Sequence, residues 1–174
     1  VEVGLRHVDL RIREVATAVV RHDSPHMVAM GVRREYGIDV LGVDPRPEYE
    51  VAGVEIQPIS ALDTLRPRAD FVIVTPPHTP ETEGMWHAER FRRMKRTAHF
   101  INVGRGKTTR LDDLVEALEQ GLIAGCGLDV FEVEPLPAAH RLWTLPNVLL
   151  TPHIAVRDAE NLPERRYQVL FDNA

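Results

Sequence analysis

The sequence contains a single cysteine, no long apolar run and no excess of basic charge. One cysteine, Cys126, excludes a disulfide within the chain and fits a reducing cytoplasmic location. No apolar stretch approaches the ~20 residues that cross a bilayer, which argues against a membrane span. A net charge of −5 gives no basis for a nucleic-acid partner. The apolar surroundings of Cys126 predict a buried structural thiol rather than a nucleophile.

The length and composition fit one globular domain. The chain has 174 residues, of which 44% are hydrophobic and 27% are charged, and a domain of this size can bury a core. Residues 90–96 (RFRRMKR) form the densest basic stretch. Because Phe91 and Met94 interrupt it, we interpret it as the solvated side of an amphipathic helix rather than as a binding patch.

Short apolar runs alternate with amphipathic segments along the chain. The runs predicted to form buried strands are residues 38–43, 71–74, 98–103, 125–130 and 147–150. The segments predicted to form helices are residues 28–36, 60–65, 81–95 and 111–119. Ser60 is expected to cap the second helix and Gly121 to end the last. This alternation predicts an α/β fold with a Rossmann-type, doubly wound parallel sheet.

Polar residues follow the predicted strands. Because ligands bind beyond the carboxyl ends of the strands in such a sheet, these positions are the candidate site. They are Asp44; Thr75, Pro76 and Pro77; Gly104, Arg105 and Gly106; Asp129 through Glu134; and Thr151, Pro152 and His153. Collected at one edge, an arginine, a glutamate and a histidine can bind a carboxylate and move a proton.

The first of these positions, Asp44, suits a nucleotide ribose. A carboxylate at the end of a strand can accept hydrogen bonds from the 2′-hydroxyl and would repel a 2′-phosphate, which favours NAD over NADP. Arg46, two residues later, weakens that preference. The alternative is that Asp44 only begins an Asp-Pro turn.

The three candidate catalytic residues are each ambiguous alone. The glycines on either side of Arg105 let its backbone approach a ligand, and its guanidinium matches a carboxylate, but the same triplet suits an exposed surface turn. His153 can exchange a proton near neutral pH, although a lone histidine is more often structural. Glu134 would fix the imidazole tautomer if it reaches His153, and is otherwise an ordinary loop acid.

Several motifs occur in a recognisable order: TPET at 79–82, NVGRG at 102–106, GLDVFEVEPLP at 127–137 and LLTPHIA at 149–155. With IDVLGVDP before them, they closely resemble the D-isomer-specific 2-hydroxyacid dehydrogenase family. The resemblance runs from about residue 28 to residue 155 and continues into RRYQVLFDN. It implies the NAD-binding domain of an oxidoreductase that transfers a hydride between nicotinamide and the C2 carbon of a small 2-oxo or D-2-hydroxy acid.

The resemblance also implies roles for individual residues. His153 would be the general acid/base, Glu134 its partner and Arg105 the anchor of the substrate carboxylate. The cofactor-binding residues would be Asp44 at the adenosine ribose and Asp129 at the nicotinamide, together with Pro76, Pro77, Val103, Gly104, Arg105 and His153. A homodimer formed through this domain is implied as well, and no metal, membrane or nucleic acid is expected.

The glycine-rich turn that should hold the pyrophosphate is degenerate. One placement, residues 21–26 (RHDSPH), keeps none of its three glycines, and the other, residues 4–9 (GLRHVD), keeps only the first. In either placement a side chain stands where the pyrophosphate should approach the main chain.

The domain organisation follows from the same resemblance. Residues 1–155 are expected to form the NAD-binding domain, and residues 156–174 to begin the helix that returns toward a largely absent substrate domain. Two hypotheses therefore remain. The chain is an NAD-dependent dehydrogenase present as a fragment or degenerate copy, or it is a catalytically inactive relative that serves as a dimerising or binding module.

Overall fold

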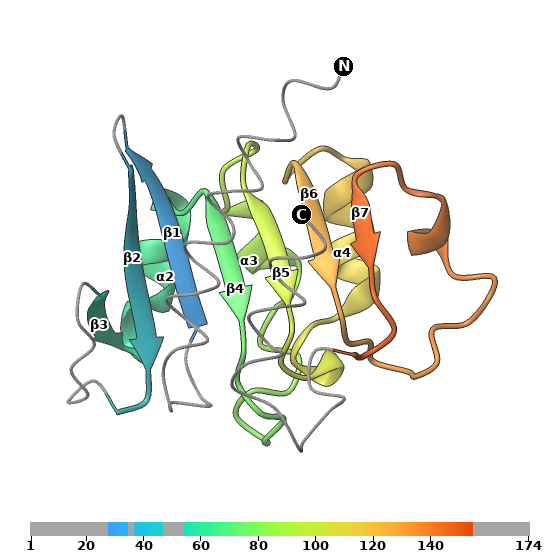
Figure 1. Cartoon of the computed structure of the whole chain (residues 1–174), viewed down its shortest axis with the longest axis horizontal. Helices are drawn as coiled ribbons and strands as arrows, with labels where there is room; N and C mark the ends of the chain where they lie inside the picture. Colours follow the sequence, from blue (N-terminus) through green and yellow to red (C-terminus); the bar gives the residue numbers. More distant parts are fainter. Residues whose placement is uncertain (1–27, 35–36, 47–53, 155–174) are drawn as a thin grey trace.

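The computed structural model describes residues 28–34, 37–46 and 54–154 of the chain (Figure 1). They form a seven-stranded sheet in the order β3-β2-β1-β4-β5-β6-β7. The strands are β1 (Val28–Arg34), β2 (Gly37–Asp44), β3 (Val54–Pro58), β4 (Phe71–Val74), β5 (His99–Asn102), β6 (Gly125–Leu128) and β7 (Val148–Leu150). β2 pairs in parallel with β3, and β4 through β7 pair in parallel with one another. The predicted α/β class with a Rossmann-type sheet is confirmed, and the sheet is mostly rather than wholly parallel.

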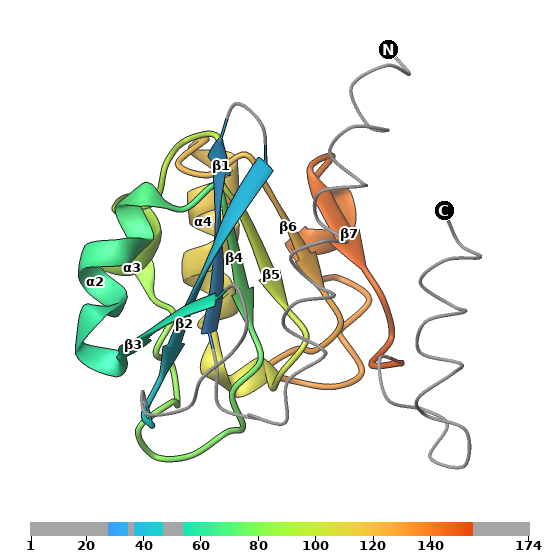
Figure 2. The same ribbon diagram turned by 60° about the vertical axis from the view of Figure 1, so that its left-hand side comes forward.

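Helices cover one face of this sheet. They are α2 (Leu62–Leu65), α3 (Ala88–Arg92) and α4 (Leu111–Glu119), with single 3₁₀ turns η1 (Ile59–Ala61), η2 (Arg66–Arg68), η3 (Gly106–Thr108) and η4 (Arg141–Thr144). Figure 2 shows α2, α3 and α4 on the same side. The helix predicted at 111–119 is confirmed, and Gly121 ends it with φ of 62°. The expected cap does not form, because Ser60 lies within η1 and no side chain caps α2.

The helix predicted over residues 28–36 is wrong, because this segment forms strand β1. β1 runs antiparallel to both of its neighbours, β2 and β4, and its arrow points the opposite way in Figure 1. Val28 and Met30 are fully buried at a spacing of two, and Gly31 would weaken a helix. As a consequence β1 starts, rather than ends, beside the carboxyl ends of β2 and β4, where Val28 pairs with Val43 and Val74.

The helix predicted over residues 81–95 is much shorter, since only α3 is helical there. Thr82 holds the preceding turn: its hydroxyl accepts from the Thr79 N–H at 2.8 Å and donates to the Pro77 carbonyl at 2.7 Å. Gly84 then takes a left-handed φ of 57°, which a helix interior does not allow. Trp86 follows in an extended conformation, and its main-chain N–H donates to the Thr108 carbonyl at 2.9 Å. The Thr82 hydroxyl and Gly84 therefore prevent a helix before residue 88, although the apolar residues there have helical spacing.

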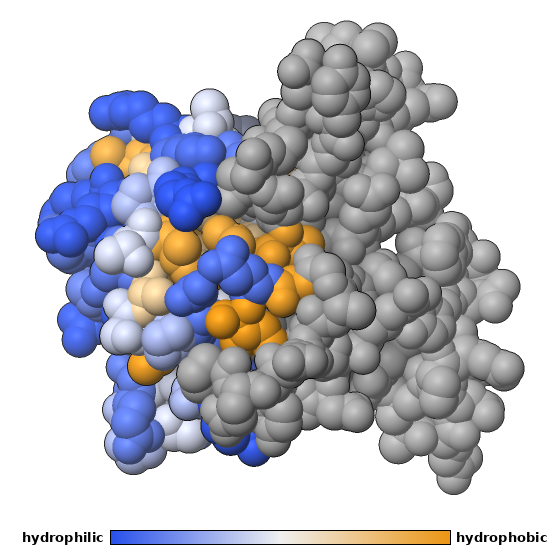
Figure 3. All heavy atoms as spheres, turned by 90° about the vertical axis from the view of Figure 1, so that its left-hand side faces the viewer, coloured by the Kyte–Doolittle hydropathy of each residue, from blue (hydrophilic) through white to orange (hydrophobic). Residues whose placement is uncertain are grey.

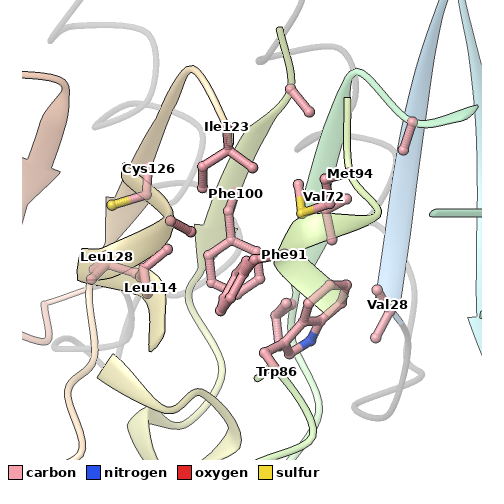
Figure 4. Packing of buried hydrophobic residues seen from close by; sticks show 14 of the residues in the cluster. Val28, Val72, Trp86, Phe91, Met94, Phe100, Leu114, Ile123, Cys126 and Leu128 are labelled. Atoms are coloured by element: carbon pink, nitrogen blue, oxygen red, sulfur yellow. The ribbon is translucent and has the colours of Figure 1, made fainter. Parts of the chain in front are cut away.

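The core lies between the sheet and the helices. Trp86, Phe91 and Phe100 form its aromatic centre (Figure 4), with ring centroids 5.0 to 6.1 Å apart. All three side chains are fully buried, and each contributes roughly 1.5–3 kcal/mol by leaving water. Cys126 is also buried within this cluster, as predicted. The aromatic centre therefore fixes α3 against β5 below the loops that end the strands.

The edges of the sheet are less apolar than its middle. Figure 3 views the β3 side and shows hydrophilic side chains over much of that face, with a hydrophobic area toward its centre. β7 was expected to be buried on both faces, but Leu149 is 69% exposed. That expectation is wrong because β7 pairs only with β6 among the described strands. β3, which the sequence did not predict, extends the opposite end of the sheet.

Candidate active site

The loops that follow β4, β5, β6 and β7 meet at one edge of the sheet. Main-chain hydrogen bonds extend the pairing past the strand ends: the N–H groups of Val103, Asp129 and Thr151 donate to the carbonyls of Val74, Asn102 and Leu128 at 2.9 to 3.1 Å. The parallel direction of these strands makes this shared edge inevitable. Thus the positions proposed from sequence to lie after four separate strands do lie side by side.

The loop that carries Arg105 is held from below by Asn102, the last residue of β5. The Asn102 side chain is 1% exposed. Its Oδ1 accepts from the Gly104 N–H at 3.0 Å, and its Nδ2 donates to the Arg105 carbonyl at 3.2 Å. The Arg105 side chain is exposed, and one guanidinium nitrogen donates to the Gly104 carbonyl at 2.8 Å. The Arg105 guanidinium is therefore exposed to solvent, while the main chain that carries it is held by Asn102.

The two glycines beside Arg105 serve a purpose other than the one predicted. A Cβ on Gly104 would lie 2.8 Å from the Pro76 carbonyl oxygen, and a Cβ on Gly106 would overlap the main chain of Phe131. Both glycines thus allow close approach of other protein loops. The sequence predicted that these glycines make room for a ligand, but the space beside them is taken by main chain of the protein itself. They join the Arg105 loop to the loops after β4 and β6.

Glu134 reaches His153, as the sequence required of a catalytic pair. The Glu134 Oε2 lies 2.7 Å from the His153 Nδ1, and its Oε1 accepts from the Phe131 N–H at 3.0 Å. Burial raises the pKa of Glu134, but these two contacts outweigh it, so its pKa lies below the ordinary value of 4.5. Glu134 therefore engages Nδ1 of the His153 ring and not Nε2.

The main chain at His153 is in a left-handed conformation, with φ of 53°. Asp129 braces it, because its Oδ1 accepts from the Thr151 hydroxyl at 2.6 Å and from the Ile154 N–H at 3.0 Å. A histidine in this conformation persists only where its surroundings enforce it. Asp129 thus holds Thr151 and Ile154, which lie before and after His153. Its contact with nicotinamide stays a prediction.

The remaining cofactor candidates lie where strand order places them. Asp44 ends β2, is 1% exposed, and its Oδ1 accepts from the Arg46 N–H at 2.8 Å. This bond is the Asp-Pro turn considered as the alternative, and the ribose contact stays a prediction. Pro76 is buried, Pro77 is partly buried and Val103 is 38% exposed. These apolar groups border Gly104 at the shared edge.

Both candidate positions for the glycine-rich turn, 4–9 and 21–26, lie outside the described residues, as do residues 156–174. The reversed β1 bears on the turn, however. β1 leads away from the carboxyl edge, whereas the first strand of a dinucleotide-binding domain ends at that edge and is followed by the phosphate-binding turn. No group of acidic, histidine or cysteine side chains suited to a metal ion occurs among the described residues, and none of their helices is long and apolar enough to cross a membrane.

Sequence reasoning missed the residues that support the catalytic candidates. Asn102 belongs to a quoted motif but received no role, and the packing of Gly106 on Phe131 was not foreseen. The signal for Asn102 was available, because an amide at the end of an otherwise apolar strand is buried only when its hydrogen bonds are satisfied. The Gly106 contact had no local signal, since it joins loops of two different strands.

The family model described as "D-isomer specific 2-hydroxyacid dehydrogenase, NAD binding domain" matches residues 28–155. The chain belongs to this family. A glyoxylate reductase/hydroxypyruvate reductase of Homo sapiens is 45% identical to this dehydrogenase-family chain over 113 residues, which are 65% of the chain and 34% of the relative. A glyoxylate reductase of Thermofilum pendens is 50% identical over 94 residues, which are 54% of the chain and 28% of the relative.

Solved structures of the D-2-hydroxyacid dehydrogenase family share this fold. A D-isomer specific 2-hydroxyacid dehydrogenase from Xanthobacter autotrophicus, in complex with NADPH and MES, has a TM-score of 0.64 and 43% identity, covering 68% of this chain and 38% of that one. An NADPH-dependent glyoxylate/hydroxypyruvate reductase from Sinorhizobium meliloti, in complex with NADP and sulfate, has a TM-score of 0.64 and 38% identity, covering 68% and 39%. The chain spans about a third of the length of the curated relatives it matches.

Proposed function

We propose that this chain provides the catalytic and cofactor-binding side of a dehydrogenase that reduces a small 2-oxo acid, such as hydroxypyruvate to its D-2-hydroxy acid or glyoxylate to the achiral glycolate. The observation that carries the proposal is the 2.7 Å contact between His153 Nδ1 and Glu134 Oε2, which lies at the sheet edge that also holds Arg105. The relatives named as glyoxylate and hydroxypyruvate reductases support the choice of substrate.

The chemistry needs a cation and an acid. Arg105 pairs with the substrate carboxylate through its guanidinium and orients the 2-oxo carbon. His153, with Glu134 on its Nδ1, gives the Nε2 proton to the substrate oxygen as that oxygen gains charge. A bound dihydronicotinamide supplies the hydride that reduces the carbon. The carboxylate of Glu134 stabilises the positive charge that the imidazole carries before it releases the proton.

The residues at this edge suit the nicotinamide end of a dinucleotide better than its phosphates. Val103 offers partly exposed apolar surface beside Gly104 and Arg105, and Asp129 stands at the end of the neighbouring strand. β1 runs away from this edge, unlike the strand that leads into a pyrophosphate-binding turn. Asp44 favours NAD, whereas the related solved structures contain NADPH or NADP. We therefore propose NAD as the cofactor and a direct comparison with NADP as the test of Asp44.

The direction of β1 favours a second candidate, the catalytically inactive relative that serves as a dimerising or binding module. In a dinucleotide-binding domain the first strand is parallel to its neighbours and leads into the phosphate-binding turn, whereas β1 is antiparallel to β2 and β4. In this alternative the catalytic residues are retained without turnover. A homodimer is proposed under either candidate, and light scattering measures it. The cytoplasmic location likewise stays a prediction.

The first experiment follows NADH oxidation with glyoxylate and with hydroxypyruvate. We expect His153→Ala to lower kcat by at least about a hundredfold, the range of general acid catalysis. His87→Ala is the matched control, because His87 precedes α3 and its side chain makes no capping bond. Equal rates for wild type and His153→Ala would remove the proposed role of His153.

The second experiment separates the two candidates. Calorimetric titration of the wild-type chain with NAD and with NADP measures cofactor binding independently of turnover. Binding of NAD in the micromolar to low millimolar range supports the dehydrogenase. Absence of heat with either cofactor at millimolar concentration would overturn that function for this chain and favour the binding module.

A further inference from the structure

Asn102 makes several hydrogen bonds at the candidate site, and the sequence assigned it no role. Asn102 ends β5 and is 1% exposed. Its amide nitrogen lies 3.2 Å from the Arg105 carbonyl oxygen, 3.1 Å from the Thr108 hydroxyl and 3.0 Å from the Thr109 hydroxyl, and its two hydrogens are shared among these three acceptors. Its amide oxygen accepts from the Gly104 N–H at 3.0 Å. A single side chain thus contacts the main chain on both sides of the Arg105 Cα.

We propose that Asn102 is the positioning residue of Arg105, which fixes where the guanidinium stands and so determines the affinity for the substrate carboxylate. This inference rests on the proposed function, in which Arg105 anchors that carboxylate. Asn102 does not touch the substrate in this proposal. It acts through the loop of residues 103–109, whose main chain it holds.

The chemistry of the four contacts requires an amide. Asn102 accepts from the Gly104 N–H and donates to the Arg105 carbonyl, and an amide side chain is able to do both. Aspartate has the same shape but accepts only, and leucine provides neither group. The two requirements also fix which end of the amide is oxygen, so the orientation follows from the partners.

Asn102 is tied to the sheet through its main chain and to two buried threonines through its side chain; we call this set of contacts the Asn102 clamp. The Asn102 carbonyl accepts from the Asp129 N–H at 3.0 Å, which ties the end of β5 to the end of β6. The Arg105 carbonyl also accepts from the Thr108 hydroxyl at 2.7 Å and from the Thr108 main-chain N–H at 3.2 Å. Thr108 and Thr109 are both buried. Because the Asn102 main chain is paired within the sheet while its side chain bonds to residues 104–109, a change of the side chain moves the Arg105 loop before it moves the sheet.

The test compares three variants of the wild-type chain. Asn102→Asp keeps the shape and the acceptor for Gly104 but loses the donor to Arg105. Thr109→Val removes one partner of Asn102 without adding charge. Asn147→Asp is the matched control, since the Asn147 amide also donates to a main-chain carbonyl, that of Ala124 at 3.0 Å, but lies before β7 at the opposite edge. Each protein is assayed for KM and kcat with glyoxylate and NADH, and for thermal midpoint.

We expect Asn102→Asp to raise the KM for glyoxylate by about tenfold or more, as loss of a buried hydrogen bond to a positioned group implies. Thr109→Val should raise KM in the same direction by a smaller factor, which excludes the added charge as the cause. Asn147→Asp should lower the thermal midpoint and leave KM unchanged. A wild-type KM in both Asn102→Asp and Thr109→Val would overturn the proposal.

A second readout separates this proposal from the proposed function. In ¹⁵N NMR spectra, Asn102→Asp should shift the Arg105 amide and Nε signals, and Asn147→Asp should leave them in place. If the wild-type chain shows no turnover, the proposed function has failed for this chain, and these signals alone decide the positioning role. Unchanged Arg105 signals in Asn102→Asp would overturn it.

Discussion

Gly106 and Phe131 lie main chain against main chain, so closely that a side chain at Gly106 has no room. Gly106 directly follows Arg105, and the Phe131 N–H holds the carboxylate of Glu134 at 3.0 Å. The same carboxylate contacts His153. Through this contact, the loop that carries Arg105 packs directly against the loop that carries Glu134.

Gly106→Ala is expected to destabilise the fold strongly, while Gly127→Ala is tolerated. A Cβ at Gly106 would overlap the Phe131 carbonyl, whereas a Cβ at Gly127 would lie 3.8 Å from the Ile101 side chain, an ordinary contact. The free energy of unfolding should fall by about 3 kcal/mol or more at Gly106 and change by less than about 1 kcal/mol at Gly127. Urea denaturation measures both. Similar losses in the two variants would contradict the close contact.

Glu134→Gln and Glu132→Gln are expected to separate catalysis from stability. Glutamine at 134 can no longer stabilise a charged His153 ring, so kcat should fall by about a hundredfold. Glu132 instead accepts from the Leu111 N–H at 2.6 Å at the start of α4. Glu132→Gln should therefore cost only about 0.5 kcal/mol of stability and leave kcat unchanged. Steady-state kinetics and urea denaturation distinguish them, and equal kcat in the two variants would count against the Glu134–His153 pair.

The stability of the chain should depend on pH through Glu134. Its contacts with His153 and the Phe131 N–H outweigh the opposing effect of burial and hold its pKa below the ordinary 4.5. A depressed folded pKa gives stability that is present above the unfolded value and lost as pH falls through the folded value. Wild type should exceed Glu134→Gln in unfolding free energy at pH 7, and the difference should shrink below about pH 4. Urea titrations at several pH values check this. A difference that stays constant down to pH 3 would contradict the assignment.

Cys126 is expected to resist thiol reagents in the folded protein. Burial raises the pKa of the Cys126 thiol to about 12, so about one molecule in ten thousand carries a thiolate at pH 8. A colorimetric disulfide reagent should react on the timescale of unfolding, and at once in guanidinium chloride. Rapid labelling of the native chain would show that β6 is more accessible than its packing indicates.

Much of the candidate site was predictable because it depends on local order along the chain. Arg105, Glu134 and His153 each follow an apolar run, and parallel strands bring such positions together whatever the loop lengths. The resemblance implied that Glu134 partners His153, but the geometry of their contact was not predictable from local order. The 2.7 Å distance from Glu134 to His153 and the bracing of His153 by Asp129 depend on how three loops turn after leaving the sheet. Asp44 was ambiguous for the same reason, and the structure shows its turn.

The sequence by itself determined the α/β class, the family motifs and the edge of the sheet at which the chemistry lies, because apolar periodicity and residue order are properties of neighbouring residues. Only the tertiary structure decided the direction of β1, the loop contacts that occupy the space beside Gly104 and Gly106, and the clamp at Asn102. Strand direction comes from pairing with β2 and β4. The position of His153 comes from hydrogen bonds to Asp129 and Glu134, which lie in a loop distant in sequence, and no local pattern encodes them.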